Sequence, residues 1–462
     1  CSGGAILSVR AANLRSVIDR WSRDQVLELA PDAPSRKAAQ GVAAPGKWPV
    51  SGVASEVVWG ECKGSGATPY HACVDLSEPA FKCSCPSRKF PCKHAVGLLL
   101  LWSAGGVPEA EGLPPWTAEW MAQRQDRADR RAAAAVAAKT TAEASGPHDP
   151  DPARGREQAD ARAAQRERRV TAGLSELERW LTDQIRQGIA GTRTSGFGHW
   201  DDLAKRLVDA QATGVASAVG RLAAVLSGDD WPARLVEEYA LLHLLAVAHR
   251  REPGGDLGLT VRSRVGFPVS REEVLAGPAV RDEWHVLGRR DTEQDRLIAR
   301  RVWLRGRATG RPALVLSFAP IGQPLDASLP TGGVVDADLA FYPGSGPLRA
   351  QVAERHSMRN GGEPPGVSIS AALSEVAGAL AADPWLDSWP VVLAGVVPLR
   401  GGARWLLGHP GQAEGWPLAG GSPPWRLVAA SGGHPLTVAA EWTPRGLVPL
   451  STHDEEGQVI VL

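Results

Sequence analysis

The chain has 462 residues, of which 51 are basic and 51 acidic, so its formal net charge is zero at neutral pH. This length exceeds what one hydrophobic core can organise and predicts about two to four domains. The balanced charge favours neither nucleic acid nor a membrane surface as a partner of the whole chain. No apolar stretch approaches the roughly 20 residues that a transmembrane helix needs, so we expect no membrane span.

Residues 1–16 are predicted to be an extension upstream of the folded protein. The chain begins with Cys1 rather than a methionine. Val17 could be a non-ATG start, because it lies just before a plausible helix N-cap at Ser22. The alternative interpretation is a lipoprotein processed at Cys1.

Residues 17–110 are predicted to form a small domain of helices and antiparallel strands. Two short helices are expected at 24–30 and 35–41, with Ser22 and Ser35 as their N-caps. Strands are expected at 56–63 and 70–76, joined by a Gly-rich turn, and residues 80–82 lead into a cysteine-rich segment. An apolar run at 95–102 predicts a further helix. Because this meander is too small to hold a core alone, we expect a metal ion to stabilise it.

Three cysteines and a histidine lie close together in this segment. Cys83 and Cys85 form a Cys-x-Cys pair, and Cys92 and His94 follow after six residues as a Cys-x-His pair. Two ligands two residues apart would point to opposite faces of a strand, so both pairs must lie on turns, which the neighbouring prolines favour. Three thiolates and an imidazole are a common structural zinc set. The sequence therefore predicts one structural zinc ion, with an iron–sulfur centre or a disulfide as the alternatives.

The pattern Cys83-x-Cys85-x6-Cys92-x-His94 resembles the signature of the SWIM zinc finger. The wider segment 59–94 looks like the bacterial SWIM zinc finger proteins, which carry the finger near the N-terminus of a long chain. This resemblance implies a zinc-dependent module that binds DNA or protein, and it does not imply catalysis. It also implies a protein partner, such as an AAA-type ATPase or a von Willebrand A protein.

Two further cysteines, Cys62 and Cys73, lie outside this pattern on the two strands of the first hairpin. We interpret them as reduced packing residues, because few other metal-ligating side chains lie near them in the sequence. Thiolate zinc ligands favour a reducing compartment, so we expect the protein to be cytoplasmic.

The rest of the chain divides by composition into three segments. Residues 111–172 are rich in Ala, Arg and acidic residues and are predicted to be a charged linker. Residues 173–252 are predicted to be a helical domain, with a capping box at Ser175, and its residues His243 and His249 are interpreted as structural. Residues 253–462 are predicted to be β-rich and barrel-like, with one helix at 370–382. The strands expected there are 302–305, 313–318, 334–342, 391–397, 425–430, 436–442 and 459–462. The fold class is thus α+β and multidomain.

No motif of an enzyme is recognised, since neither a phosphate-binding loop nor a nucleophile elbow occurs, and we expect no catalytic activity. Four basic residues surround the ligands: Lys82, Arg88, Lys89 and Lys93. They could contact the phosphates of DNA, or they could offset the negative charge of three thiolates and one zinc ion. Because four cations are few for duplex binding, we predict a protein-interaction scaffold or adaptor, with DNA binding through this basic rim as the alternative.

Overall fold

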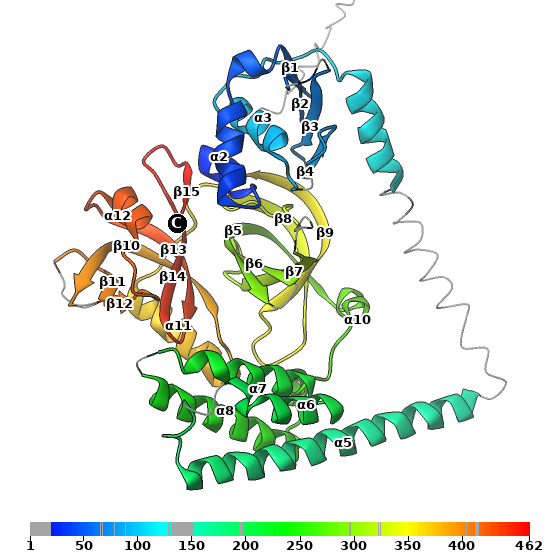
Figure 1. Cartoon of the computed structure of the whole chain (residues 1–462), viewed down its shortest axis with the longest axis vertical. Helices are drawn as coiled ribbons and strands as arrows, with labels where there is room; N and C mark the ends of the chain where they lie inside the picture. Colours follow the sequence, from blue (N-terminus) through cyan, green and yellow to red (C-terminus); the bar gives the residue numbers. More distant parts are fainter. Residues whose placement is uncertain are drawn as a thin grey trace, which may run out of the picture.

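The computed structural model describes residues 20–127, 130 and 152–462, except 65, 67, 78, 88, 194–196, 229, 295–296, 322, 324, 403 and 412–414. The predicted extension at 1–16 and its start at Val17 lie outside these residues. The fold is α+β, as predicted: a small sheet with helices, a helical bundle, a closed β-barrel and a six-stranded sheet follow one another along the chain (Figure 1). Among the described helices, none combines the length and the apolar character of a membrane span.

The N-terminal unit is an antiparallel sheet in the strand order β1-β2-β3-β4 with helices packed on it. The predicted meander is confirmed, and it gains a first strand, β1, that the sequence did not indicate. The elements are α1 (Arg23–Glu28), α2 (Ala33–Val42), the short 3-10 helix η1 (Pro45–Lys47), β1 (Val50–Ala54), β2 (Val57–Cys62), β3 (Tyr70–Asp75), β4 (Ala80–Cys83) and α3 (Lys93–Ser103).

The two N-caps predicted here have different outcomes. Ser22 caps α1 as expected, in a capping box with Gln25. The N-cap of α2 is Asp32 and not Ser35, because the Asp32 carboxylate accepts a hydrogen bond from the Ser35 amide at 2.7 Å. An Asp-Ala-Pro sequence favours this arrangement, since Asp is a strong N-cap and proline is tolerated in the first helical turn.

Helix α3 is the central element of this unit, and nearly all of its side chains are buried. A helix that is apolar on all sides must be covered on all sides. One side of α3 contacts β2 and β3, and the other contacts α1 and α2. The contact with α2 is close at Gly97, where a Cβ atom would lie 2.5 Å from a methyl group of Val42.

The helical domain begins earlier than its predicted capping box. Helix α5 runs without a break from within the predicted linker, so Ser175 lies in its interior and donates a hydrogen bond to the Thr171 carbonyl. The predicted helix start at Ser175 is therefore wrong. His243 and His249 contact different acidic residues, as expected for structural histidines. The domain contains α5 (Pro152–Gln187), the short 3-10 helix η2 (Phe197–His199), α6 (Asp201–Asp209), α7 (Thr213–Val225), α8 (Trp231–Arg251) and α9 (Gly255–Val265).

The predicted barrel is confirmed as a closed structure in the strand order β5-β6-β7-β9-β8. Its neighbours are antiparallel except for β7 and β9, which are parallel. This is a five-stranded Greek-key arrangement of the OB type. Trp284, Val302, Leu304 and Leu339 are among the side chains that fill the barrel. The elements are α10 (Arg271–Ala276), β5 (Ala279–Gln294), β6 (Leu297–Gly306), β7 (Pro312–Pro320), β8 (Gly333–Phe341) and β9 (Arg349–Asn360).

The C-terminal sheet has the order β12-β11-β10-β13-β14-β15 and packs on the outside of the barrel. One strand prediction here is wrong: residues 425–430 form helix α12, because a short, mostly apolar segment fits either structure and Gly432 in the left-handed region ends a helix. The elements are α11 (Ile369–Ala382), β10 (Trp389–Gly401), β11 (Arg404–Gly408), β12 (Gly415–Pro417), α12 (Trp425–Ser431), β13 (Leu436–Thr443), β14 (Gly446–His453) and β15 (Val459–Val461).

The N-terminal unit is docked on both the barrel and the C-terminal sheet. Buried Arg289 of β5 forms an ion pair with Glu28 of α1, with 2.9 Å between Nε and Oε1, and also donates to the Glu28 carbonyl. The buried Gln25 side chain donates to the carbonyl of Thr331 at 2.8 Å. Figure 1 shows α2 and the small sheet above the barrel and beside β15. The cysteine cluster is therefore part of a unit whose position is fixed by the remainder of the chain.

Candidate metal centre

The four predicted ligands lie where β4 ends and α3 begins. Cys83 is the last residue of β4, and Cys85 follows in the next turn. Cys92 is the N-cap residue of α3, and His94 projects from the first turn of that helix. The chain thus reverses between the two pairs, and this brings ligands eleven residues apart into one cluster.

The ligand atoms of Cys83, Cys85, Cys92 and His94 all lie within 4.8 Å of one another. The Sγ atom of Cys83 lies 3.8 Å from Nδ1 of His94. In a tetrahedral site with zinc–sulfur bonds of about 2.3 Å, ligand atoms are separated by roughly 3.5–3.8 Å. Cys92 and His94 are buried, whereas Cys83 and Cys85 are partly exposed. The donor set and its spacing therefore fit one zinc ion with a closed shell of four protein ligands.

The thiols of Cys83, Cys85 and Cys92 differ in the direction in which their pKa is shifted. Hydrogen bonds from the Cys83 thiol, from His94 and from the Ala95 amide lower the pKa of Cys92 to about 4. The pKa of Cys83 is raised, because its thiol donates to Cys92 and is largely buried. Burial also raises the pKa of Cys85. A zinc ion would bind the three cysteines as thiolates and displace their protons.

The side chain of Tyr70 completes the surroundings of the histidine. Its ring stacks on the His94 imidazole, with 4.9 Å between the ring centroids and an angle of 30° between the planes. Tyr70 begins β3, so the sheet orients the histidine ligand that α3 supplies. The role of Tyr70 does not follow from the ligand spacing, and the one signal for it in the sequence is its position in the strand beside the ligand segment.

The lysines of the predicted basic rim differ in whether they form an ion pair. Lys82 and Lys93 are exposed. Lys89 instead forms an ion pair with the Asp32 carboxylate on α2, with 2.6 Å between Nζ and Oδ2. Hydrogen bonds from Lys89 and Ser35 lower the pKa of Asp32 to about 2. Arg88 lies outside the described residues. The structure thus places the three described lysines around the ligands but leaves only two of them exposed without an ion pair.

Cys62 and Cys73 lie on opposite faces of the small sheet. Cys62 packs against α3, whereas Cys73 contacts the other core, which contains Trp120 from a helix that begins at residue 115. Both thiols are free and fully buried, and burial raises the pKa of Cys73 to about 12. Their interpretation as packing residues is confirmed.

A second grouping of possible ligands lies on the barrel at Asp338, Glu354 and His356. His356 Nε2 lies 2.5 Å from the Asp338 carboxylate and Nδ1 lies 3.8 Å from that of Glu354. The two ring nitrogens thus face different carboxylates, and Glu354 is mostly exposed. Surface ion pairs account for this arrangement.

Two families of domain match the chain. A model of the SWIM zinc finger matches residues 73–102, and a model of the SWIM-associated four-helix bundle domain matches residues 165–265. The first match contains all four ligands, and the second extends from the middle of α5 to the end of α9. Comparisons with curated proteins and with solved structures give no significant match.

Proposed function

For a chain that carries a SWIM zinc finger together with its associated helical bundle, we propose a non-catalytic role as a protein-interaction scaffold or adaptor. Zinc is held by Cys83, Cys85, Cys92 and His94 and stabilises the finger. Four protein ligands close the zinc shell and leave no position for a substrate, which supports a structural rather than a catalytic metal.

The ion pair between Lys89 and Asp32 is the observation that carries the proposal. A surface that binds DNA gains affinity from cations that exchange counterions for phosphates. Here one cation of the rim is already paired within the protein, at 2.6 Å. Of the described rim residues, Lys82 and Lys93 remain without an ion pair, and so few charges give only weak, salt-sensitive contact with a duplex. A protein partner depends less on such a rim, because interfaces between proteins rely on apolar and aromatic contacts.

The role of the other domains supports the same proposal. The finger is fixed to the barrel by a buried ion pair, and the helical bundle is joined to the barrel through Thr260 and Ser345, whose hydroxyls lie 3.2 Å apart. A chain that holds several domains at fixed positions suits an assembly platform. The partner we propose is a protein, with an AAA-type ATPase or a von Willebrand A protein as the specific expectation.

The cytoplasm is the proposed location. A reducing compartment keeps thiols available as zinc ligands, whereas an oxidising one would drive them toward disulfides.

A comparison of two variants tests protein binding against DNA binding. Affinity-tagged wild type and Cys85→Ser are used to capture partners from the native cell, and both are titrated with duplex DNA at 50 and 200 mM salt. The scaffold proposal expects specific proteins on the wild type that are lost on the variant. In the same titration, Lys93→Glu should leave the weak DNA mobility shift unchanged. If Lys93→Glu abolishes a strong shift, and both baits capture the same proteins, the DNA-binding alternative replaces the proposal.

A further inference from the structure

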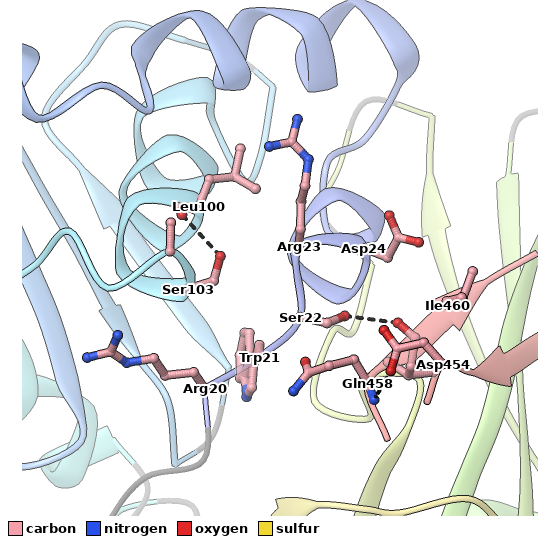
Figure 2. A pocket seen from close by; sticks show the side chains of 12 residues that line it. Arg20, Trp21, Ser22, Arg23, Asp24, Leu100, Ser103, Asp454, Gln458 and Ile460 are labelled. Carbon is pink, nitrogen blue, oxygen red and sulfur yellow. Dashed lines mark hydrogen bonds between the residues drawn. The ribbon is translucent and has the colours of Figure 1, made fainter. Parts of the chain in front are cut away.

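A hollow of about 570 Å³ lies where the finger meets the C-terminal sheet. It is formed by three segments that are distant in sequence: the entry to α1, the end of α3 and the turn that leads into β15 (Figure 2). Its volume falls within the range of ligand-binding pockets, and junctions between domains are a common place for them. It lies outside the zinc cluster and shares no residue with it.

The charges of this hollow are separated between its two sides. In Figure 2, Arg20 and Arg23 lie toward the finger, whereas Asp24 and Asp454 lie toward β15. Asp24 is neutralised by an ion pair with Arg426 at 2.6 Å. Neither arginine has an ion-pair or hydrogen-bond partner for its guanidinium group within the part of the chain that the structure describes. Two exposed cations therefore stand beside the hollow without a counter-charge.

Apolar side chains form part of the lining of the hollow, and its far wall is a sheet edge. Trp21, Leu100 and Val459 line it and are each at most 5% exposed. Among the described strands, β15 pairs with β14 alone. The backbone amide of Leu462 donates a hydrogen bond to the carbonyl of Leu450, and the amide of Asp454 donates to the carbonyl of Gln458. Because backbone groups of successive residues alternate between the two sides of a strand, the amide and carbonyl of Val459 face away from β14.

One of these outward groups already binds a neighbouring segment. The carbonyl of Val459 accepts a hydrogen bond from the Ser22 hydroxyl at 3.1 Å (Figure 2). The amide N–H of Val459 has no hydrogen-bond partner among the described residues. A sheet edge with an unused donor favours an extended polypeptide as occupant, because main-chain groups of a peptide can satisfy it.

We propose that this hollow binds an extended polypeptide segment of a partner protein, in which acidic side chains alternate with apolar ones. The proposal rests on the scaffold function and names the surface that performs it. The apolar side chains lie against Trp21 and Leu100. The acidic side chains lie toward Arg20 and Arg23, since Asp454 repels them at the other end.

The test uses the full-length zinc-loaded protein and two fluorescein-labelled nonapeptides. Both have the pattern Gly-Ser-Leu-X-Leu-X-Leu-Ser-Gly, with X as glutamate in one and lysine in the other, and binding is measured by fluorescence polarisation. We expect the glutamate peptide to bind at least tenfold more tightly, and raised salt to weaken it. Arg20→Gln/Arg23→Gln should reduce its affinity about fivefold or more, whereas Lys37→Gln on α2 should leave it unchanged.

A gain of affinity provides a second readout that misfolding cannot imitate. Asp454→Asn keeps an oxygen that can accept from the Gln458 amide but removes the negative charge. It should increase the affinity for the glutamate peptide about two- to threefold. Equal binding of the two peptides, or equal loss in the Lys37 variant, would overturn the proposal. If the arginine variant still captures the cellular partners that Cys85→Ser loses, the scaffold function stands and this surface is wrong.

Discussion

The ion pair between Arg289 and Glu28 offers a quantitative test of how the finger is held on the barrel. The two side chains are only 6% and 12% exposed, and burial lowers the pKa of Arg289. Replacing Arg289 by methionine keeps much of its apolar stem but leaves the Glu28 carboxylate buried without a counter-charge. Removing one partner of a buried pair typically costs about 3–5 kcal/mol.

The carboxyl group itself limits this cost, because it can bind a proton. Neutralising a glutamate with an ordinary pKa of about 4.3 at pH 7 costs about 3.7 kcal/mol, at 1.36 kcal/mol per pH unit. At pH 5.5 the same limit is about 1.6 kcal/mol. A carboxylate buried without a counter-charge is destabilising only in its charged form, so the destabilisation is present at high pH and is relieved as pH falls. We therefore expect Arg289→Met to lose about 3 kcal/mol at pH 7 and about 2 kcal/mol less than that at pH 5.5.

Local hydrogen exchange of α1, read by mass spectrometry, measures this free energy without requiring the whole chain to unfold in one step. Glu28→Gln/Arg289→Met should recover most of the loss. The matched control is Arg281→Met, which removes one partner of the exposed pair between Arg281 and Asp336 on the same barrel and should cost below about 1 kcal/mol. Equal costs at the buried and exposed pairs, or a cost at Arg289 that does not change with pH, would refute the reasoning.

Three further changes probe the finger itself. Cys85→Ser should lose the single zinc ion that elemental analysis finds in reduced wild-type protein; a wild type without zinc would contradict the assignment. Gly97→Ala should destabilise the contact of α3 with α2 by about 1–3 kcal/mol, because the added Cβ lies 3.0 Å or less from α2 atoms. Gly41→Ala, which meets nothing within 4 Å, should be neutral or slightly stabilising in the same denaturant titration. Asp32→Ala removes the N-cap of α2 and should cost about 1 kcal/mol in the exchange of α2 amides, whereas loss of the exposed Lys89 should cost less.

The metal centre was predictable from the sequence because all of its ligands lie within one short segment. Cys83 to His94 span twelve residues, and their spacing alone defines the donor set. The role of Asp32 was not assigned, since it lies far from Lys89 in sequence and meets it only when α2 packs on α3. Tyr70 is a similar case, because strand pairing brings it to His94. Side chains that surround a site from other elements depend on tertiary packing, which spacing does not reveal.

The β-rich half of the chain likewise combines features that the local sequence predicts with features that depend on tertiary packing. The hairpin of β6 and β7 was recognised from its alternating pattern, but the parallel pairing of β7 with β9 joins segments that the sequence does not relate. Helix α9 was missed because glycines at its start suggested a turn. Segment 425–430 is the opposite case: its β-favouring residues Trp425 and Val428 predict a strand, whereas its tertiary context makes it helical.

The closed barrel has a consequence for how this protein can change shape. A closed ring of strands has no free edge, so none of the neighbouring domains can join or leave it by exchanging a strand. In the part of the chain that the structure describes, the finger, the six-stranded sheet and the bundle contact its outer surface through side chains and loops. These contacts hold the three units in place, and a shift of any of them would leave the ring of strands intact. The barrel therefore serves as the fixed support to which the other three units are attached.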